Sequence, residues 1–133
     1  MERQGRGSSD VVSIDTLRDE VLGELDLLVE SAATLRGELR GFEVAIKKAR
    51  RYLEKGGSAG NMRSVVDIGA AREQLSQVAE KFQTHRHKAR LAVFRMQIAE
   101  GLSVGAIARE WGLSRQLVSR MLKETPAEQA SEN

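Results

Sequence analysis

Apolar side chains recur between residues 14 and 53 in steps of three and four, the periodicity of one helix face. They are Ile14, Leu17, Val21, Leu25, Leu28, Ala32, Leu35, Leu39, Phe42, Ile46, Ala49 and Leu53. An extra step of four at Val21–Leu25 interrupts the heptad pattern as a stutter. The pattern predicts one long amphipathic helix, and a small chain cannot bury so long an apolar seam without a partner helix.

The ends of this predicted helix carry recognisable cap residues. Asp10 or Ser13 is expected to cap its start, and Gly56 is expected to end it in a left-handed conformation. Inside it, Gly37 and Gly41 weaken the helix by about 1 kcal/mol each. The sequence therefore allows a kink or a break near them.

A second helical pattern follows the linker GGSAG at residues 56–60, and it comprises Val65, Ile68, Ala71, Leu75, Val78 and Phe82. Ser64 and Asp67, three residues apart, resemble a capping box at its start. A short linker between two amphipathic helices predicts an antiparallel helical hairpin. The basic segment THRHKAR at residues 84–90 is interpreted either as a loop or as a continuation into the next helix.

Two short helices are predicted near the carboxyl end, after a segment that carries Leu91, Phe94 and Ile98 and ends at Gly101. Ser103 is placed to cap a helix over residues 104–111. Gly112 can adopt the left-handed conformation of a tight turn, and Ser114 can cap a further helix over residues 115–123.

The composition agrees with an all-α fold, because there is one proline and only 4% aromatic residues. We expect a long amphipathic helix or helical hairpin over residues 10–84, resembling a dimeric coiled coil, followed by a three-helix domain over residues 85–124. Residues 1–9 and the acidic residues 125–133 are expected to be disordered tails. The absence of cysteine excludes disulfides and thiolate metal sites, and no apolar run is long enough for a membrane span. A cytoplasmic location is expected.

Charge is unevenly distributed, although the net charge is only +2. Residues 10–30 carry net −6, residues 36–55 carry net +4, and residues 84–123 carry eight basic and two acidic side chains, net +6. A basic block beside a helical break favours a polyanion, of which nucleic acid is the commonest. Charge alone supports a solvated basic face equally well.

The stretch VGAIAREWGLSRQLVSRMLK resembles the helix-turn-helix of bacterial DNA-binding regulators. It is similar to the DNA-binding ends of resolvase and invertase recombinases, to sigma factor region four and to sugar-responsive repressors. The resemblance covers residues 101–124, and residues 91–101 would supply the supporting first helix. It implies a small residue, a turn glycine and a β-branched residue among the domain core positions, which are Ile107, Ala108, Trp111, Gly112, Leu113, Val118 and Met121.

In such a motif, the first turns of the second helix meet base edges in the major groove. The expected base contacts are Ser114, Arg115, Gln116 and Arg120, because Arg can pair with guanine and Gln with adenine. The expected phosphate contacts are Ser103, Ser119, Lys123, Arg86, Lys88 and Arg90. The alternative for these side chains is ordinary charge on a solvated helix surface. His85 and His87 lack the further ligands of a metal site, so neither metal nor cofactor is expected.

These features favour a dimeric transcriptional regulator that binds double-stranded DNA in the nucleoid. The homodimer would form through residues 14–53. The acidic and basic blocks would meet in an antiparallel pair, which favours that arrangement, although the sequence does not decide between antiparallel and parallel pairing. The alternative is a nucleoid-associated, partition or phage accessory adaptor whose coil recruits another protein. The absence of an evident ligand pocket favours an adaptor over a metabolite-sensing repressor. An enzyme is not expected, because no strand pattern or Ser/Arg constellation indicates a catalytic domain.

Overall fold

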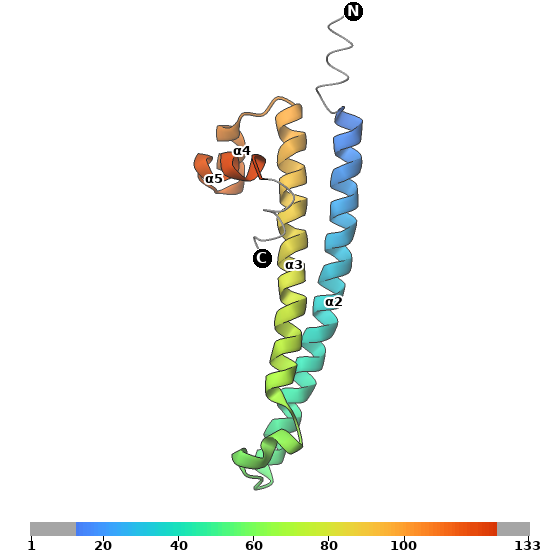
Figure 1. Cartoon of the computed structure of the whole chain (residues 1–133), viewed down its shortest axis with the longest axis vertical. Coiled ribbons are helices and arrows are strands. Elements are labelled where there is room, and N and C mark those ends of the chain that lie inside the picture. Colours follow the sequence, from blue (N-terminus) through green and yellow to red (C-terminus); the bar gives the residue numbers. More distant parts are fainter. Residues whose placement is uncertain (1–12, 125–133) are drawn as a thin grey trace, which may run out of the picture. The chain divides into compact units, whose positions relative to one another are not determined.

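The computed structural model describes residues 13–124, and within that range the chain is all-α, as predicted. The expected disordered tails and the alternative cap Asp10 lie outside the described residues. Figure 1 shows the elements, which are α2 (Ile14–Glu54), the 3₁₀ helix η1 (Ala59–Ser64), α3 (Ile68–Ala99), α4 (Val104–Trp111) and α5 (Arg115–Leu122). None of these helices combines the length and apolar character needed to cross a lipid bilayer.

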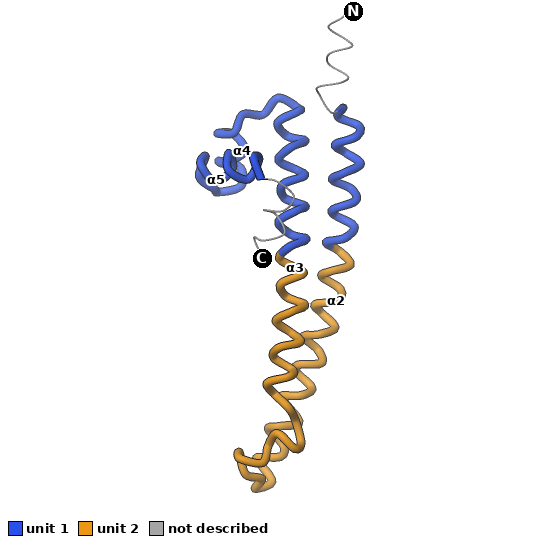
Figure 2. The backbone as a smooth tube through the Cα atoms, viewed as in Figure 1, with its two compact units in different colours: residues 1–28, 84–133 blue, residues 29–83 orange. Residues whose placement is uncertain are grey.

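The chain divides into two compact units, which are described separately (Figure 2). The described part of unit 1 comprises Ser13, residues 14–28 of α2, residues 84–99 of α3, and the short helices α4 and α5 with the turns beside them. Unit 2 comprises residues 29–83, and it contains the rest of α2 and α3 with η1 between them.

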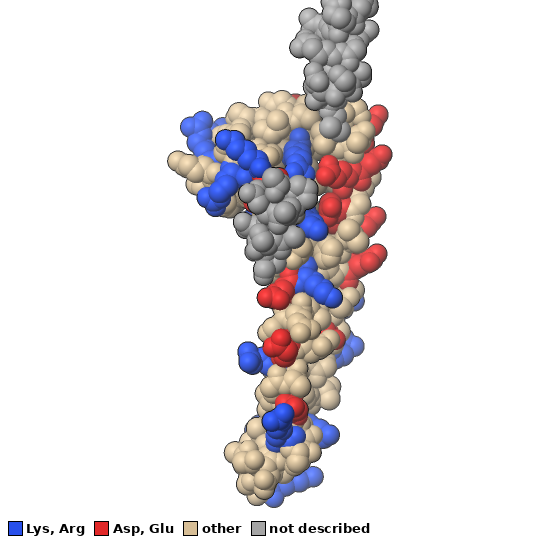
Figure 3. All heavy atoms as spheres, viewed as in Figure 1, with Lys and Arg blue, Asp and Glu red and all other residues tan. Residues whose placement is uncertain are grey.

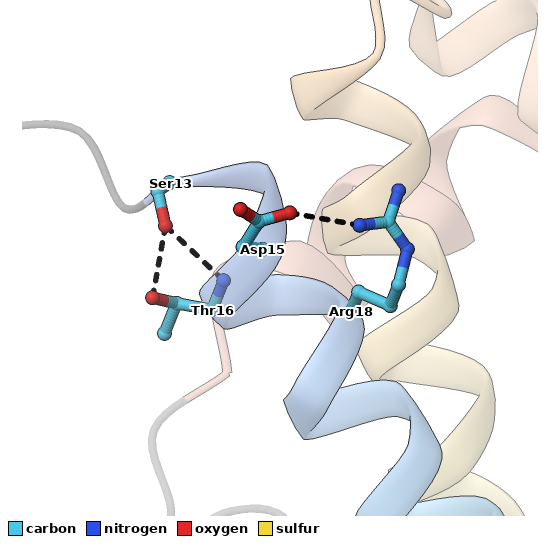
Figure 4. Close-up of polar contacts among 4 residues, drawn as sticks. All are labelled: Ser13, Asp15, Thr16 and Arg18. Atoms are coloured by element: carbon cyan, nitrogen blue, oxygen red, sulfur yellow. Dashed lines mark hydrogen bonds and ion pairs between the residues drawn. The ribbon is translucent and has the colours of Figure 1, made fainter.

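The start of α2 is capped by Ser13 (Figure 4). The backbone N–H of Thr16 donates a hydrogen bond to the Ser13 hydroxyl over 3.1 Å, and the hydroxyls of these two residues lie 2.9 Å apart. Arg18 donates to the Asp15 carboxylate over 2.9 Å. Asp15 in the first turn also interacts favourably with the helix dipole. These local interactions explain why the helix begins at Ile14.

α2 continues through Gly37 and Gly41, so the break that the sequence allowed there does not occur. A Cβ atom at either glycine would meet no atom within 4 Å, which shows that nothing packed against the helix requires a glycine there. Each glycine costs the helix about 1 kcal/mol. Interrupting the helix would cost several backbone hydrogen bonds, at about 1 kcal/mol each, so the continuous helix is favoured.

The end of α2 and the turn after it belong to unit 2. Gly56 adopts a φ of 93°, the left-handed conformation expected at this helix end. The Tyr52 hydroxyl donates to the carbonyl of Ser58 over 3.0 Å. The Ser58 hydroxyl in turn accepts a hydrogen bond from the N–H of Asn61, which caps η1. The last two residues of the predicted linker, 59 and 60, therefore lie in a 3₁₀ helix.

α3 begins later than the proposed capping box implied. The carboxylate of Asp67 accepts a hydrogen bond from the N–H of Ala70 over 3.0 Å, so Asp67 is at the cap position before Ile68. Ser64 instead donates to the carbonyl of Asn61 over 2.7 Å. The prediction of a cap at Ser64 is wrong because η1 already uses this residue in its last turn. α3 then runs without interruption through residues 84–90, which decides a question that periodicity left open.

The least exposed positions of α2 form a strict heptad pattern without the stutter. They are Ile14, Leu17, Val21, Glu24, Leu28, Ser31, Leu35, Glu38, Phe42, Ala45, Ala49 and Tyr52, and Ala32 is a further half-buried position beside this row. Part of the predicted seam lies beside this row, since Leu25, Leu39, Ile46 and Leu53 are 40%, 47%, 38% and 42% exposed. These four positions of the predicted seam are thus exposed in the single chain, because the four-residue step at Val21–Leu25 moves the seam off the least exposed row.

Candidate nucleic-acid interface

The carboxyl-terminal part of α3 shares one apolar core with α4 and α5 within unit 1. Six side chains form it, each at most 3% exposed, namely Leu91, Phe94, Ile107, Ala108, Val118 and Met121. Leu113 is partly buried against them. Full burial of one large apolar side chain contributes about 1.5–3 kcal/mol, so this core holds the two short helices firmly on α3. Five of the predicted core positions are found in this cluster or packed against it.

A tight turn with a cap on each side connects α4 to α5. The hydroxyls of Ser103 and Ser114 accept hydrogen bonds from the N–H groups of Ala106 and Leu117, over 3.1 and 3.0 Å. Between the helices, Gly112 lies at φ 68° and ψ 35°, in the left-handed region. The turn therefore forms through local interactions. Gly112 contributes its left-handed backbone conformation and not core packing, because it is exposed.

Trp111 lies at the margin of the core. It is 38% exposed, although the sequence placed it among the core side chains. One side of its ring packs against Phe94, with ring centroids 5.3 Å apart and planes at 81°, an edge-to-face contact. Trp111 is the last residue of α4. Its expected core role is therefore limited to this contact with Phe94.

The first two turns of α5 present polar and basic side chains to solvent. Ser114, Arg115, Gln116 and Arg120 are exposed, and Ser119 is half-buried. Figure 3 shows Lys and Arg side chains gathered over α4 and α5. Four exposed cations of these helices form no ion pair with any other described residue, and they are Arg109, Arg115, Arg120 and Lys123. This uncompensated charge makes the surface attractive to an anion.

Gly105 is a site residue that the sequence analysis missed. It is buried, and a Cβ atom built on it would lie 3.0 Å from Nη2 and 3.1 Å from Nε of Arg115. The Arg115 guanidinium therefore lies against the backbone of α4 in the free protein. A glycine inside an eight-residue helix, where it costs about 1 kcal/mol, is the sequence signal that could have indicated such a close approach.

Two polar contacts also join α3 to α4 and to the residues just after α5. Nε2 of His87 lies 2.8 Å from the Glu124 carboxylate, and these side chains are only 12% and 7% exposed. The Gln97 amide donates to Glu110 over 3.1 Å. The sequence identified neither pair, because partners so distant in the chain leave no local pattern. Among residues 13–124, no group of three or more His, Cys, Asp or Glu side chains is arranged to hold a metal ion.

The proposed contact residues lie on three elements. α5 and its cap carry Ser114, Arg115, Gln116, Ser119, Arg120 and Lys123, while Ser103 begins α4. The remaining three are on α3, where Arg86 is exposed and Lys88 and Arg90 are half-buried. Comparison of the chain with protein-family models, curated proteins and solved structures finds no match. Any functional proposal therefore depends on these residues and their geometry.

Proposed function

We propose that this protein binds double-stranded DNA sequence-specifically, with α4, the Gly112 turn and α5 acting as a helix-turn-helix. The observation that carries the proposal is the exposed amino-terminal half of α5, whose unpaired cations are displayed by a helix anchored through Val118 and Met121. A rigidly held helix with its first turns exposed suits insertion into the major groove.

The residues of α5 divide into two roles. Arg115 and Gln116 follow the Ser114 cap, and they are assigned to base edges because Arg matches guanine and Gln matches adenine through paired hydrogen bonds. Arg120 lies four residues after Gln116 and extends the same contact. Ser103, Ser119 and Lys123 are assigned to phosphates, which fix the position of the helix without reading sequence. On binding, Arg115 must leave its position against Gly105.

Binding curves on specific and random DNA test this division. Bound fragments are first selected from genomic DNA to obtain a specific site. Arg115→Ala and Gln116→Ala are each expected to cost about 1–3 kcal/mol on that site and little on random DNA. Lys88→Ala, a proposed phosphate contact, is expected to weaken both and to reduce the salt slope by about one unit.

The exposed Arg72 of unit 2 provides the matched control. Arg72→Ala removes the same kind of charge outside α4 and α5, and it is expected to leave both affinities unchanged. Equal losses of affinity on specific and random DNA for the Arg115 and Gln116 variants would show that α5 binds DNA through its charge and does not recognise sequence. An affinity that does not fall with salt would exclude the phosphate contacts altogether.

The second part of the proposal is a homodimer through residues 14–53. It is supported by a heptad row on α2 of unit 2, in which Leu39, Ile46 and Leu53 are each at least 38% exposed. Residues seven apart lie on one side of a helix, and such a row is the surface that a second helix covers in a coiled coil. Leu39→Glu combined with Ile46→Glu is therefore expected to produce monomers in sedimentation equilibrium.

Val44→Glu is the control for dimerisation, because Val44 is 60% exposed in the same unit but lies outside the heptad row. It is expected to leave the dimer intact. Cross-links between residue 20 of one copy and residue 45 of the other are expected for the antiparallel arrangement, and 20-to-20 cross-links would contradict it. A wild-type protein that is monomeric at micromolar concentration and co-purifies with a different polypeptide would support the adaptor alternative instead.

A further inference from the structure

A cavity of about 410 Å³ lies within unit 1, in the size range of small-molecule sites. Its walls come from α2, α3 and α4. The apolar part of the lining consists of Leu25, Leu28, Ala89, Val93 and Trp111. Two guanidinium side chains, Arg86 and Arg90, complete the lining. The cavity thus combines a mostly apolar wall with cations, which is the combination that recognises an amphipathic anion.

Arg90 is the polar group of this lining with an unmet hydrogen-bond requirement. Its Nε atom is buried and has no partner among the described residues. A buried donor without a partner costs about 1–3 kcal/mol, and a ligand oxygen at that position would remove the cost. Nε and the adjacent terminal nitrogen of a guanidinium form two parallel donors, a geometry that matches the two oxygens of a carboxylate.

The electrostatic environment of Arg90 also favours an anion. Burial, and then the neighbouring charge of Arg86, lower the pKa of Arg90 from its ordinary value. The Glu124 carboxylate opposes this effect only in part, and it already interacts with His87. An arginine remains charged in proteins, so the destabilised cation is stabilised when an anion binds beside it.

We propose that this cavity binds a small amphipathic monoanion, whose aromatic or aliphatic body packs against Leu28, Val93 and Trp111 and whose carboxylate or sulfonate pairs with Arg90. This site is separate from the proposed contacts of α5 with DNA and does not depend on DNA binding. It also changes the role of Arg90, which the sequence analysis had assigned to phosphate contacts. The sequence had indicated no ligand pocket because the lining residues lie far apart in the chain.

A pair of fluorescent probes that differ in one charge tests the proposal on the full-length protein. The anionic probe is 8-anilinonaphthalene-1-sulfonate, and the neutral probe is N-phenyl-1-naphthylamine, which has the same rings without the sulfonate. Trp111 is the single tryptophan of the chain, so its fluorescence reports directly on this cavity. The anionic probe is expected to bind saturably, one per chain, at least tenfold more tightly than the neutral probe, and octanoate but not octanol is expected to displace it.

Arg90→Met separates charge from packing, because methionine keeps an apolar stem but removes the guanidinium. It is expected to weaken binding of the anionic probe at least tenfold and to leave the neutral probe unaffected. Arg72→Met is the matched control and is expected to change neither. Equal affinities for the two probes, or an unchanged affinity for the anionic probe in Arg90→Met, would overturn the proposal.

Methyl chemical shifts of the wild-type protein keep the proposal testable even if Arg90→Met fails to fold. Addition of the anionic probe is expected to shift the methyl signals of Leu25, Leu28 and Val93 within the cavity. The methyl signals of Leu39 and Ile46 in unit 2 are expected to remain unchanged. The proposal is overturned if the largest shifts occur in unit 2 or if the cavity methyl groups do not respond. DNA is absent throughout, so failure here is distinct from failure of the DNA-binding proposal.

Discussion

The two compact units differ in how completely they bury their apolar side chains. Of the twelve buried apolar side chains in the described residues, ten belong to unit 1, and only Ala49 and Val66 belong to unit 2. Two helices packed against each other bury only one stripe on each. In unit 1, α4 and α5 add a third layer of side chains, which closes the core around Phe94 and Ile107.

The two units therefore differ in how complete a core each can form within one chain. Unit 1 has enough elements to bury a core within one chain, and the free surface of its short helices is polar and basic. Among the described residues, each unit exposes five large apolar side chains, and in unit 2 all five lie on α2, including Leu39 and Val44. A part of a chain with so thin a core is stabilised most by association, which agrees with the proposed dimer.

The largest expected contrast between the units is between two phenylalanines. Phe94 in unit 1 is 0% exposed, and Phe42 in unit 2 is half-buried. Phe94→Ala is expected to lower the free energy of unfolding by about 3–5 kcal/mol, because it removes a fully buried ring and leaves a cavity. Phe42→Ala is expected to cost less than half as much. Urea unfolding of both variants measures the difference, and equal losses would show that unit 2 is buried as completely as unit 1.

The next contrast is one substitution with opposite effects in the two units. Gly112→Ala in unit 1 is expected to destabilise the protein by about 1–2 kcal/mol, since an L-residue resists the left-handed conformation. Gly37→Ala in unit 2 is expected to stabilise it by about 0.5–1 kcal/mol, because the glycine is helical and has open space around it. Thermal unfolding provides the measurement. Changes of the same sign would contradict the backbone assignments.

The serine caps of unit 1 are expected to contribute about 1 kcal/mol each. Ser103→Ala and Ser114→Ala remove the acceptors for the N–H groups of Ala106 and Leu117. Ser76 lies exposed inside α3 of unit 2, and Ser76→Ala is expected to be neutral or slightly stabilising because alanine is the better helix former. Chemical denaturation compares the three variants. A loss for Ser76→Ala as large as for the caps would exclude a specific capping role.

The smallest expected effect concerns acid stability in unit 2. The pKa of Asp67 lies below its ordinary 3.8, chiefly because the Ala70 N–H donates a hydrogen bond to the carboxylate. Burial opposes this effect, and the charge of Arg63 adds to it. A carboxyl with a lowered folded-state pKa stabilises the protein above its unfolded pKa, and the contribution is lost as pH falls through the folded value.

Asp67→Asn tests this because asparagine also caps helices but does not titrate in this range. Wild type is expected to be at least as stable as the variant at about pH 7 and to lose that advantage at about pH 2. Unfolding curves at the two pH values provide the comparison. A difference between the proteins that does not change with pH would show that the Asp67 carboxylate contributes no pH-dependent stability.

The short helices could be predicted closely because the signals that define them are local. Ser103, Gly112 and Ser114 act on backbone groups within a few residues, so their positions in the sequence are sufficient to place α4 and α5. Local signals misled in unit 2, where the Ser64–Asp67 pattern predicted too early a start for α3. There, η1 competed for the same residues.

The sequence by itself determined the all-α class, the long helix, the capped turn and most of the core of unit 1, because periodicity and caps act over one or two helical turns. Only the tertiary structure decided which row of α2 faces α3, since that depends on the partner helix. It likewise decided the exposure of Trp111, the His87–Glu124 contact and the cavity beside Arg90. Each of these features depends on residues that are distant in the chain and that come together only when whole helices pack.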